Sequence, residues 1–133
     1  MKRTIKYILM LMLILSIAGM NPALVNPNPA TAMAQGVASW YAEFSPGINV
    51  TTANMEVFDH EKMTCAMWEV PFNSMVRVTN LENGKKIIVR VNDRGPARRY
   101  YRKGRIIDLT RAAFEKIAPP EKGLVKVRIE ILR

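Results

Sequence analysis

Hydrophobic and polar residues alternate along three stretches in the second half of the chain, at 76–79, 87–92 and 125–131. Such alternation is typical of a β-strand with one face buried. The pair Asn83-Gly84 lies between the first two stretches and favours the two left-handed positions of a type I′ turn. The pattern therefore predicts a β-hairpin and a separate strand near the C-terminus.

Weaker patterns predict two further strands and one short helix. Further strands are expected at 36–41 and near 104–107. Between 110 and 118 the apolar positions follow helical spacing, with a threonine that can cap the first turn and two prolines that stop the helix. Short strands with one short helix favour a small closed barrel, a mainly β fold, over a layered α/β fold.

The N-terminal region has the three parts of an export signal. These are a basic start, an apolar run and a small-residue cleavage pattern: Lys2, Arg3 and Lys6, then residues 7–20, then Ala32-Met33-Ala34. The apolar run is shorter than the ~20 residues that a helix needs to cross a bilayer. We predict a signal peptide at 1–34, a single folded domain at 35–133, and a location in the periplasm or outside the cell.

The charge balance favours a polyanionic partner. The chain has 20 Lys and Arg against 11 Asp and Glu, and the part after residue 34 still carries about +6. Export separates the protein from nucleic acid, so we expect an envelope polymer and no nucleic acid. The lone Cys65 excludes an intramolecular disulfide, and Cys65 with His60 is too few ligands for an ordinary zinc site. We predict no metal and no cofactor.

Four stretches together resemble the rare lipoprotein A family of bacterial septal-ring proteins. They are "GVASWYAEF", "TANMEVFD", "PFNSMVRVTNLENGKKIIVRVNDRGP" and "GRIIDLTRAAFEKI". The resemblance spans nearly all of the domain and implies a six-stranded double-psi β-barrel. It also implies an endolytic transglycosylase that cuts peptide-poor glycan strands of peptidoglycan to 1,6-anhydromuramoyl products, with cell-division proteins as possible partners. No cysteine follows the apolar run, so we expect no lipid anchor.

Position by position, the resemblance places three acidic site residues on Glu56, Asp93 and Asp108. It also shows departures. The family's usual histidine corresponds to Met67, and Ala42 and Met55 stand where glycine is usual. Since methionine cannot transfer a proton, a non-catalytic, expansin-like glycan-binding barrel is the alternative function.

Lytic cleavage needs an acid that protonates the leaving oxygen and a base that helps the muramoyl 6-hydroxyl attack. One carboxyl can serve both steps, and Asp108 is our choice because the apolar pair before it, at the end of the expected strand, favours partial burial of the acid. Asp93, beside Arg94, would then stabilise positive charge on the sugar, and Glu56 would line the other side of the cleft. In the alternative readings, Asp108 binds the start of the following helix, Asp93 pairs with an arginine, and Glu56 is solvated.

Aromatic and basic residues supply candidate substrate contacts. Aromatic rings stack on sugar faces and guanidinium groups attract an acidic glycan. We take Trp40, Tyr41, Arg94 and Arg105 as substrate-binding candidates, although aromatic residues in a domain of this size also serve as core and the basic run 98–105 also fits a solvated loop. A further hypothesis lets His60 replace the missing histidine if its loop folds back.

Overall fold

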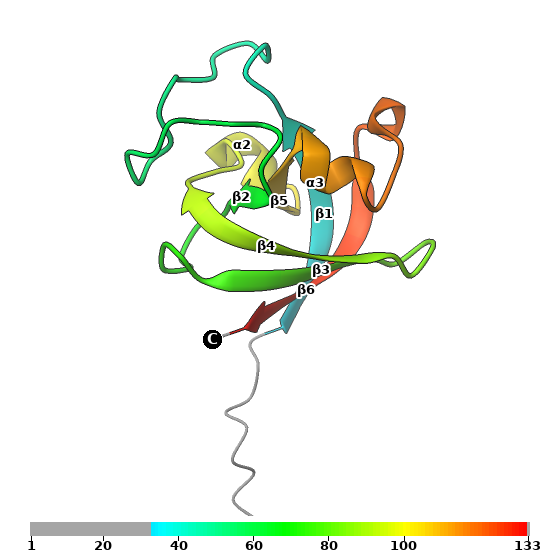
Figure 1. Cartoon of the computed structure of the whole chain (residues 1–133). Helices are drawn as coiled ribbons and strands as arrows, with labels where there is room; N and C mark the ends of the chain where they lie inside the picture. The colour runs from blue at the N-terminus through cyan, green and yellow to red at the C-terminus, as the bar shows by residue number, and fades with distance from the viewer. Residues whose placement is uncertain (1–32, 133) are drawn as a thin grey trace, which may run out of the picture. The chain divides into compact units, whose positions relative to one another are not determined.

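The computed structural model describes residues 33–132. They form six strands, two short α-helices and a 3-10 turn: β1 (Met33–Tyr41), β2 (Thr64–Ala66), β3 (Met75–Asn80), β4 (Lys86–Asp93), α2 (Arg98–Tyr101), β5 (Arg105–Thr110), α3 (Arg111–Glu115), η2 (Pro120–Lys122) and β6 (Val125–Leu132). The strands close into one barrel in the order β1-β5-β2-β4-β3-β6 (Figure 1). The predicted mainly β, six-stranded closed barrel is confirmed.

Parallel and antiparallel pairs are mixed in this barrel. β1 runs parallel to β5 and β2 runs parallel to β4, whereas the other four neighbours are antiparallel. The close contact of β1 with β5 requires Gly36, because a Cβ there would lie 2.8 Å from the Gly104 carbonyl oxygen and from the Ile106 side chain. Within residues 33–132 closure leaves no exposed sheet edge, which protects short strands from pairing with other chains.

Aliphatic side chains from five strands and Cys65 from β2 fill the interior, and α3 closes one side with Phe114. Six apolar positions that the alternation marked are buried, at Ile87, Val89 and Val91 of β4 and at Val125, Val127 and Ile129 of β6; the pattern differs only at Asn92, which is also buried, and at Ile131, which is partly exposed. Burying such side chains contributes about 1.5–3 kcal/mol each. Packing therefore stabilises the domain without a disulfide; its one cysteine, Cys65, is free and buried.

The hairpin of β3 and β4 is confirmed, but the predicted type I′ turn is wrong. The Asn80 N–H donates to the Lys85 carbonyl, which leaves a four-residue loop at 81–84. Of the two turn residues only Gly84 has a positive φ, at 73°. The Asn83 side chain instead donates to the Ile117 carbonyl at 2.9 Å and accepts from the Lys85 N–H at 2.9 Å. It thereby ties the hairpin to the segment after α3.

Two other details differ from the sequence predictions. The predicted helix is α3, in which the Thr110 hydroxyl accepts from the Ala113 N–H as a cap, but α2 is a second helix in place of an expected loop. No residue of α2 is buried, so it carries no helical periodicity. β2 was missed because all three of its residues are buried, which removes the alternation.

The predicted signal peptide lies almost entirely outside the described residues. Its last two positions fall inside β1, where Met33 pairs with Glu130 and Ala34 pairs with Ile129. Within residues 33–132, no helix is long and apolar enough to cross a membrane.

Candidate active site

A cavity of about 320 Å³ lies at the end of the barrel where β1 and β4 finish. Residues of the loop at 42–63 and of the segment that contains α2 contribute to its lining, and both segments lie at this end of the barrel (Figure 1). Six of the seven predicted site residues line it: Trp40, Tyr41, Asp93, Arg94, Arg105 and Asp108. A second cavity of about 330 Å³ adjoins it, because Ile48, Asp93 and Arg94 line both. Asp93 therefore stands where the two cavities meet.

Asp108 is held by one carboxylate oxygen and leaves the other open. Ser39 Oγ donates to Oδ1 at 2.6 Å, and Arg105 Nε donates to the same oxygen at 2.9 Å. Within residues 33–132, Oδ2 accepts no hydrogen bond, and it lies next to Gly95, where a Cβ would come within 3.5 Å of it. The side chain is 15% exposed. Asp108 thus presents one oxygen atom to the cavity from a rigid strand.

The surroundings of Asp108 differ in two respects from expectation. It was expected at a strand end, but β5 continues to Thr110 because its parallel pairing with β1 continues to the Tyr41 position. The alternative role at the start of the helix belongs instead to the Thr110 hydroxyl. Asp108 is therefore available to the cavity.

Asp93 accepts three hydrogen bonds and is held on both oxygens. Oδ1 accepts from the Ala53 and Arg94 backbone N–H groups at 2.9 Å each, and Oδ2 accepts from the Tyr41 hydroxyl at 3.1 Å. Burial, together with the Asp93 carboxylate, raises the pKa of Tyr41 above its ordinary value, so the phenol stays protonated and donates. The Tyr41 ring stacks on Phe58 at 4.6 Å. Asp93 is a fixed negative charge in the cavity wall.

Glu56 does not line either cavity. Arg90 donates to its two oxygens at 2.6 and 2.9 Å, and Asn54 and Asn92 donate at 2.8 and 3.0 Å. These bonds, with the one from Arg90 the largest cause, lower the pKa of Glu56 to about 2. The carboxylate is permanently ionised at neutral pH. It joins the 51–57 loop to β4.

The two arginines that line the cavity, Arg94 and Arg105, bind different groups. Arg94 Nη1 donates to the Met67 and Val70 carbonyls at 3.0 and 2.8 Å, and its guanidinium lies 3.8 Å from the centre of the Phe72 ring. The alternative in which Asp93 pairs with an arginine does not hold for Arg94, because only the Arg94 backbone N–H contacts that carboxylate. Arg105, in contrast, bonds Asp108 directly.

The candidate Trp40 and a further tryptophan, Trp68, already make contacts within the domain. Trp40 donates from its indole N–H to the Pro120 carbonyl at 3.0 Å, which fixes its orientation in the cavity wall. The face of Trp68 carries the Arg98 guanidinium at 3.8 Å, so that face is covered. Of the aromatic residues, Trp40, Tyr41 and Tyr100 line the cavity that contains both aspartates.

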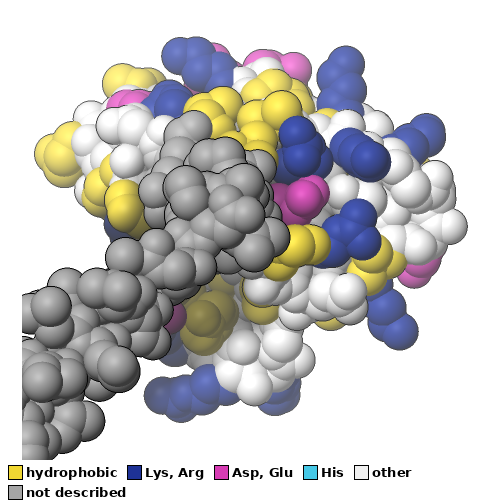
Figure 2. All heavy atoms as spheres, turned by 90° about the horizontal axis from the view of Figure 1, so that it is seen from below, with side chains coloured by type: hydrophobic (Ala, Val, Ile, Leu, Met, Phe, Trp, Pro, Cys, Tyr) yellow, Lys and Arg dark blue, Asp and Glu magenta, His cyan; other side chains and the backbone are white. Residues whose placement is uncertain are grey.

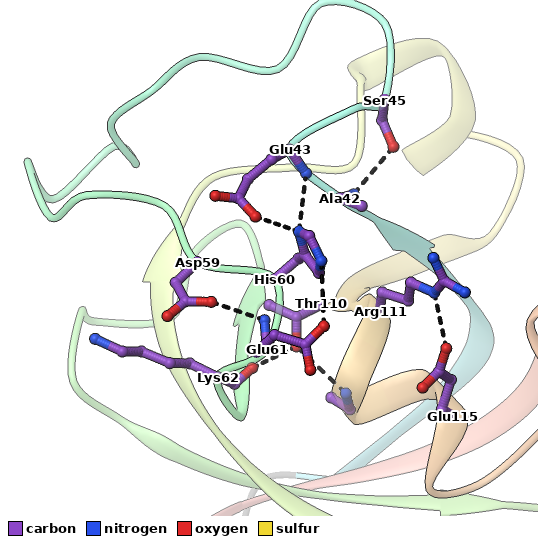
Figure 3. Close-up of polar contacts among 11 residues, drawn as sticks. Ala42, Glu43, Ser45, Asp59, His60, Glu61, Lys62, Thr110, Arg111 and Glu115 are labelled. Atoms are coloured by element: carbon purple, nitrogen blue, oxygen red, sulfur yellow. Dashed lines mark hydrogen bonds and ion pairs between the residues drawn. The ribbon is translucent and has the colours of Figure 1, made fainter.

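The residues that replace the family's histidine add no polar group to the cavity. Met67 is 4% exposed and packs in the core. Figure 3 shows His60 between Glu43 and Glu61; it contacts both carboxylates and accepts from the Glu43 N–H. It lines neither cavity. The hypothesis that His60 takes the histidine's place is not supported by this geometry.

Sequence reasoning missed Ser39 and Arg90, which hold Asp108 and Glu56. They lie 69 and 34 positions away from those acids along the chain, so no local pattern points to them. A hint for Ser39 is available, since a hydroxyl among the buried positions of a strand needs a partner. Among residues 33–132, no group of three or more His, Cys, Asp or Glu side chains is arranged to hold a metal ion.

A family model described as "Lytic transglycolase" matches residues 33–129. The chain belongs to this family. The endolytic peptidoglycan transglycosylase RlpA of Vibrio cholerae serotype O1 is 45% identical over 105 residues, which cover 79% of this chain and 38% of the relative. RlpA of Pseudomonas aeruginosa (strain UCBPP-PA14) is 47% identical over 95 residues, covering 71% and 26%. The resemblance seen in the sequence is confirmed, and the chain spans well under half the length of these relatives.

Solved structures agree on the fold. The Streptomyces papain inhibitor superposes with a TM-score of 0.60 at 24% identity, over 80% of this chain and 100% of the inhibitor. The expansin of Clavibacter michiganensis superposes with a TM-score of 0.57 at 18% identity, over 77% and 51%. At these identities the likeness shows the fold alone. The predicted double-psi β-barrel is confirmed for this family member.

Proposed function

We propose that this family member is an endolytic transglycosylase that cleaves peptide-poor glycan strands of peptidoglycan and leaves 1,6-anhydromuramoyl ends. The observation that carries the proposal is the pair of carboxylates, Asp93 and Asp108, in the wall of one cavity. Relatives that bear the name endolytic peptidoglycan transglycosylase, at 45–47% identity, support it.

Asp108 is the acid and then the base. Its open oxygen, Oδ2, gives a proton to the glycosidic oxygen as the bond from the muramoyl C1 breaks. Oδ2 then accepts the proton of the muramoyl 6-hydroxyl group as the oxygen of that hydroxyl group bonds to C1. The proton balance closes, no water is consumed, and one carboxyl serves both steps. Ser39 and Arg105 hold Oδ1, so the side chain does not rotate between the steps.

Asp93 stabilises the positive charge that develops on the sugar ring. Its oxygens are fixed by three donors, two of them backbone N–H groups, so the charge is in place before the reaction starts. Asp93 is the poorer candidate for proton transfer because both of its oxygens already accept hydrogen bonds, whereas Oδ2 of Asp108 accepts none within residues 33–132. Trp40, Tyr41, Arg94 and Arg105 position the glycan in the cavity.

The proposal is tested by mass spectrometry of purified glycan strands after incubation with the domain. Wild-type protein should produce 1,6-anhydromuramoyl ends, and Asp108→Asn should not. Asp59→Asn is the matched control, because it makes the same chemical change at a carboxylate that caps the Glu61 N–H outside both cavities. Anhydro ends at the wild-type rate from Asp108→Asn would exclude this acid.

A non-catalytic glycan-binding barrel is the second candidate function. Met67 favours it, because at this position the chain has a buried thioether and no group that transfers a proton. A binder would retain strands on a pull-down with wild type and Asp108→Asn alike and release no anhydro ends from either. The two functions therefore predict different results in the same pair of assays.

Export and septal recruitment form the remaining part of the proposal. The basic start and apolar run of residues 1–34, and a substrate that lies outside the cytoplasm, support export to the periplasm or beyond. Resemblance to septal-ring proteins supports partners among cell-division proteins. Fusion to a fluorescent protein that matures in the periplasm would test both; diffuse cytoplasmic signal would contradict export, and uniform envelope signal would contradict septal recruitment.

A further inference from the structure

A third cavity, of about 240 Å³, adjoins the cavity that contains the aspartates. Val37, Tyr100, Lys103, Arg105 and Leu124 line it. Tyr100 and Arg105 also line the aspartate cavity, so these two side chains form the partition between them. Any polymer bound across Asp108 has this third cavity directly beside it.

The third cavity combines an apolar wall with positive charge. Val37, Leu124 and the Tyr100 ring supply the apolar surface, and Leu124, just before β6, is 52% exposed. Lys103 and Arg105 supply the charge. A ligand group that fits has a short apolar body and an anionic end.

The neighbourhood strengthens the positive charge. Five cations lie within 98–105, at Arg98, Arg99, Arg102, Lys103 and Arg105. In the described part of the chain, Arg105 alone among them is paired with a carboxylate, that of Asp108. Arg99 donates to the Tyr100 hydroxyl at 3.2 Å and thereby lowers the pKa of that phenol. Figure 2 shows that Lys and Arg also spread over the face seen from below, but segment 98–105 is the basic run beside the cavities.

The proposed substrate has a branch with this chemistry. Each muramoyl residue carries a lactyl ether on O3, which has a methyl group and ends in a carboxylate or in a peptide stem with its own carboxylates. The glucosamine residues carry no such branch. The geometry points to the third cavity as a subsite for the carboxylate-bearing branch of a muramoyl residue, with Lys103 as the residue that recognises the charge. This inference rests on the proposed glycan substrate and adds its specificity.

Binding of small sugars tests the subsite without any cleavage. The probes are N-acetylmuramic acid, its methyl ester, N-acetylglucosamine and N-acetylmuramoyl-L-alanyl-D-isoglutamine, titrated into 15N-labelled domain and followed by amide chemical shifts. We expect N-acetylmuramic acid to shift the signals of Tyr100, Lys103 and Leu124 and to bind at least fivefold more tightly than its ester. If N-acetylmuramoyl-L-alanyl-D-isoglutamine binds more tightly than N-acetylglucosamine and N-acetylmuramic acid does not, the carboxylate that is recognised belongs to the peptide stem.

Two matched variants separate recognition from general attraction. Lys103→Gln should remove the preference for the acid over the ester, whereas Arg102→Gln removes the same charge one residue away, outside the lining, and should keep it. Equal affinity for all four probes, or equal loss of the preference in both variants, would overturn the subsite. Because these probes are not cleaved, such a result would leave the anhydro-end assay untouched, and a failed anhydro-end assay would leave the subsite standing.

Discussion

Asp108 and Glu56 are both acids that the family motifs mark, yet their surroundings differ. Glu56 accepts from three side chains on both oxygens and lies outside the cavities, whereas Asp108 is held on one oxygen and offers the other to a cavity. A carboxylate whose lone pairs are occupied holds structure together; one with an open oxygen can exchange a proton. The motifs identify both acids, but only their hydrogen bonds show that Glu56 is placed for a structural role and Asp108 for proton exchange.

The largest expected effect is on turnover at Asp108. Asp108→Asn removes the proton donor while keeping the size of the side chain and an acceptor for Ser39. We expect the rate of anhydro-end formation to fall by ~100-fold or more, with a change in melting temperature of at most a few degrees. Progress curves and thermal denaturation measure the two quantities. A tenfold loss or less would place Asp108 in the same class as Glu56.

Glu56→Gln should lower stability and leave the rate almost unchanged, the opposite of Asp108→Asn. It removes the charge partner of Arg90 on a pair that is about one-third exposed, so we expect the free energy of unfolding to fall by about 1–2 kcal/mol. The rate per folded molecule should stay within about threefold of wild type, since the side chain lines neither cavity. Urea denaturation followed by an assay at full folding measures both. A large loss of rate with unchanged stability would instead give Glu56 a role in the reaction.

The same carboxylate predicts a dependence of stability on pH. The pKa of Glu56 is lowered in the folded state, from 4.5 to about 2, so its contribution is present above pH 4.5 and is lost as the pH falls towards 2. Across that window wild type should lose more stability than Glu56→Gln, and the two should converge near pH 2. Parallel stability curves over the whole window would contradict the assignment of this shift.

Tyr41→Phe tests how much the hydrogen bond from Tyr41 to Asp93 contributes to the rate and to stability. It removes one of three hydrogen bonds to that carboxylate and keeps the ring that stacks on Phe58. We expect a loss of about 1 kcal/mol in stability and a three- to tenfold lower rate, since Asp93 keeps its two backbone donors. Glycan binding by pull-down should persist. A rate as low as that of Asp108→Asn would make Tyr41 a proton carrier.

The smallest expected effect is at Met55, beside Glu56. Met55 has φ = 71°, a left-handed conformation that glycine adopts without strain, and its side chain is 79% exposed. Met55→Gly should therefore raise the free energy of unfolding by about 0.5–1 kcal/mol. Ala42, the other position where glycine is usual, has no positive φ and should not respond in this way. Thermal denaturation of both glycine variants provides the comparison.

Local patterns predicted much of the fold and less of the site. The alternation in β4 and β6 and the cap at Thr110 were readable because each depends on residues within a few positions of one another. β2 was not, since three buried residues leave no period, and neither was the four-residue loop, because Asn83 bonds a carbonyl 34 positions away. For the site, the motifs supplied Asp93 and Asp108, but not the donors that hold them.

The sequence by itself determined five of the six strands, the closed barrel and the identity of the acids, because burial of alternate residues and motif order are properties of the linear chain. Only the tertiary structure decided that Asp108 meets Ser39 and Arg105, that Glu56 is bound by Arg90, and that Met67 is buried. The physical reason is that hydrogen bonds depend on atoms within about 3 Å. In a closed barrel those atoms come from strands that are far apart along the chain.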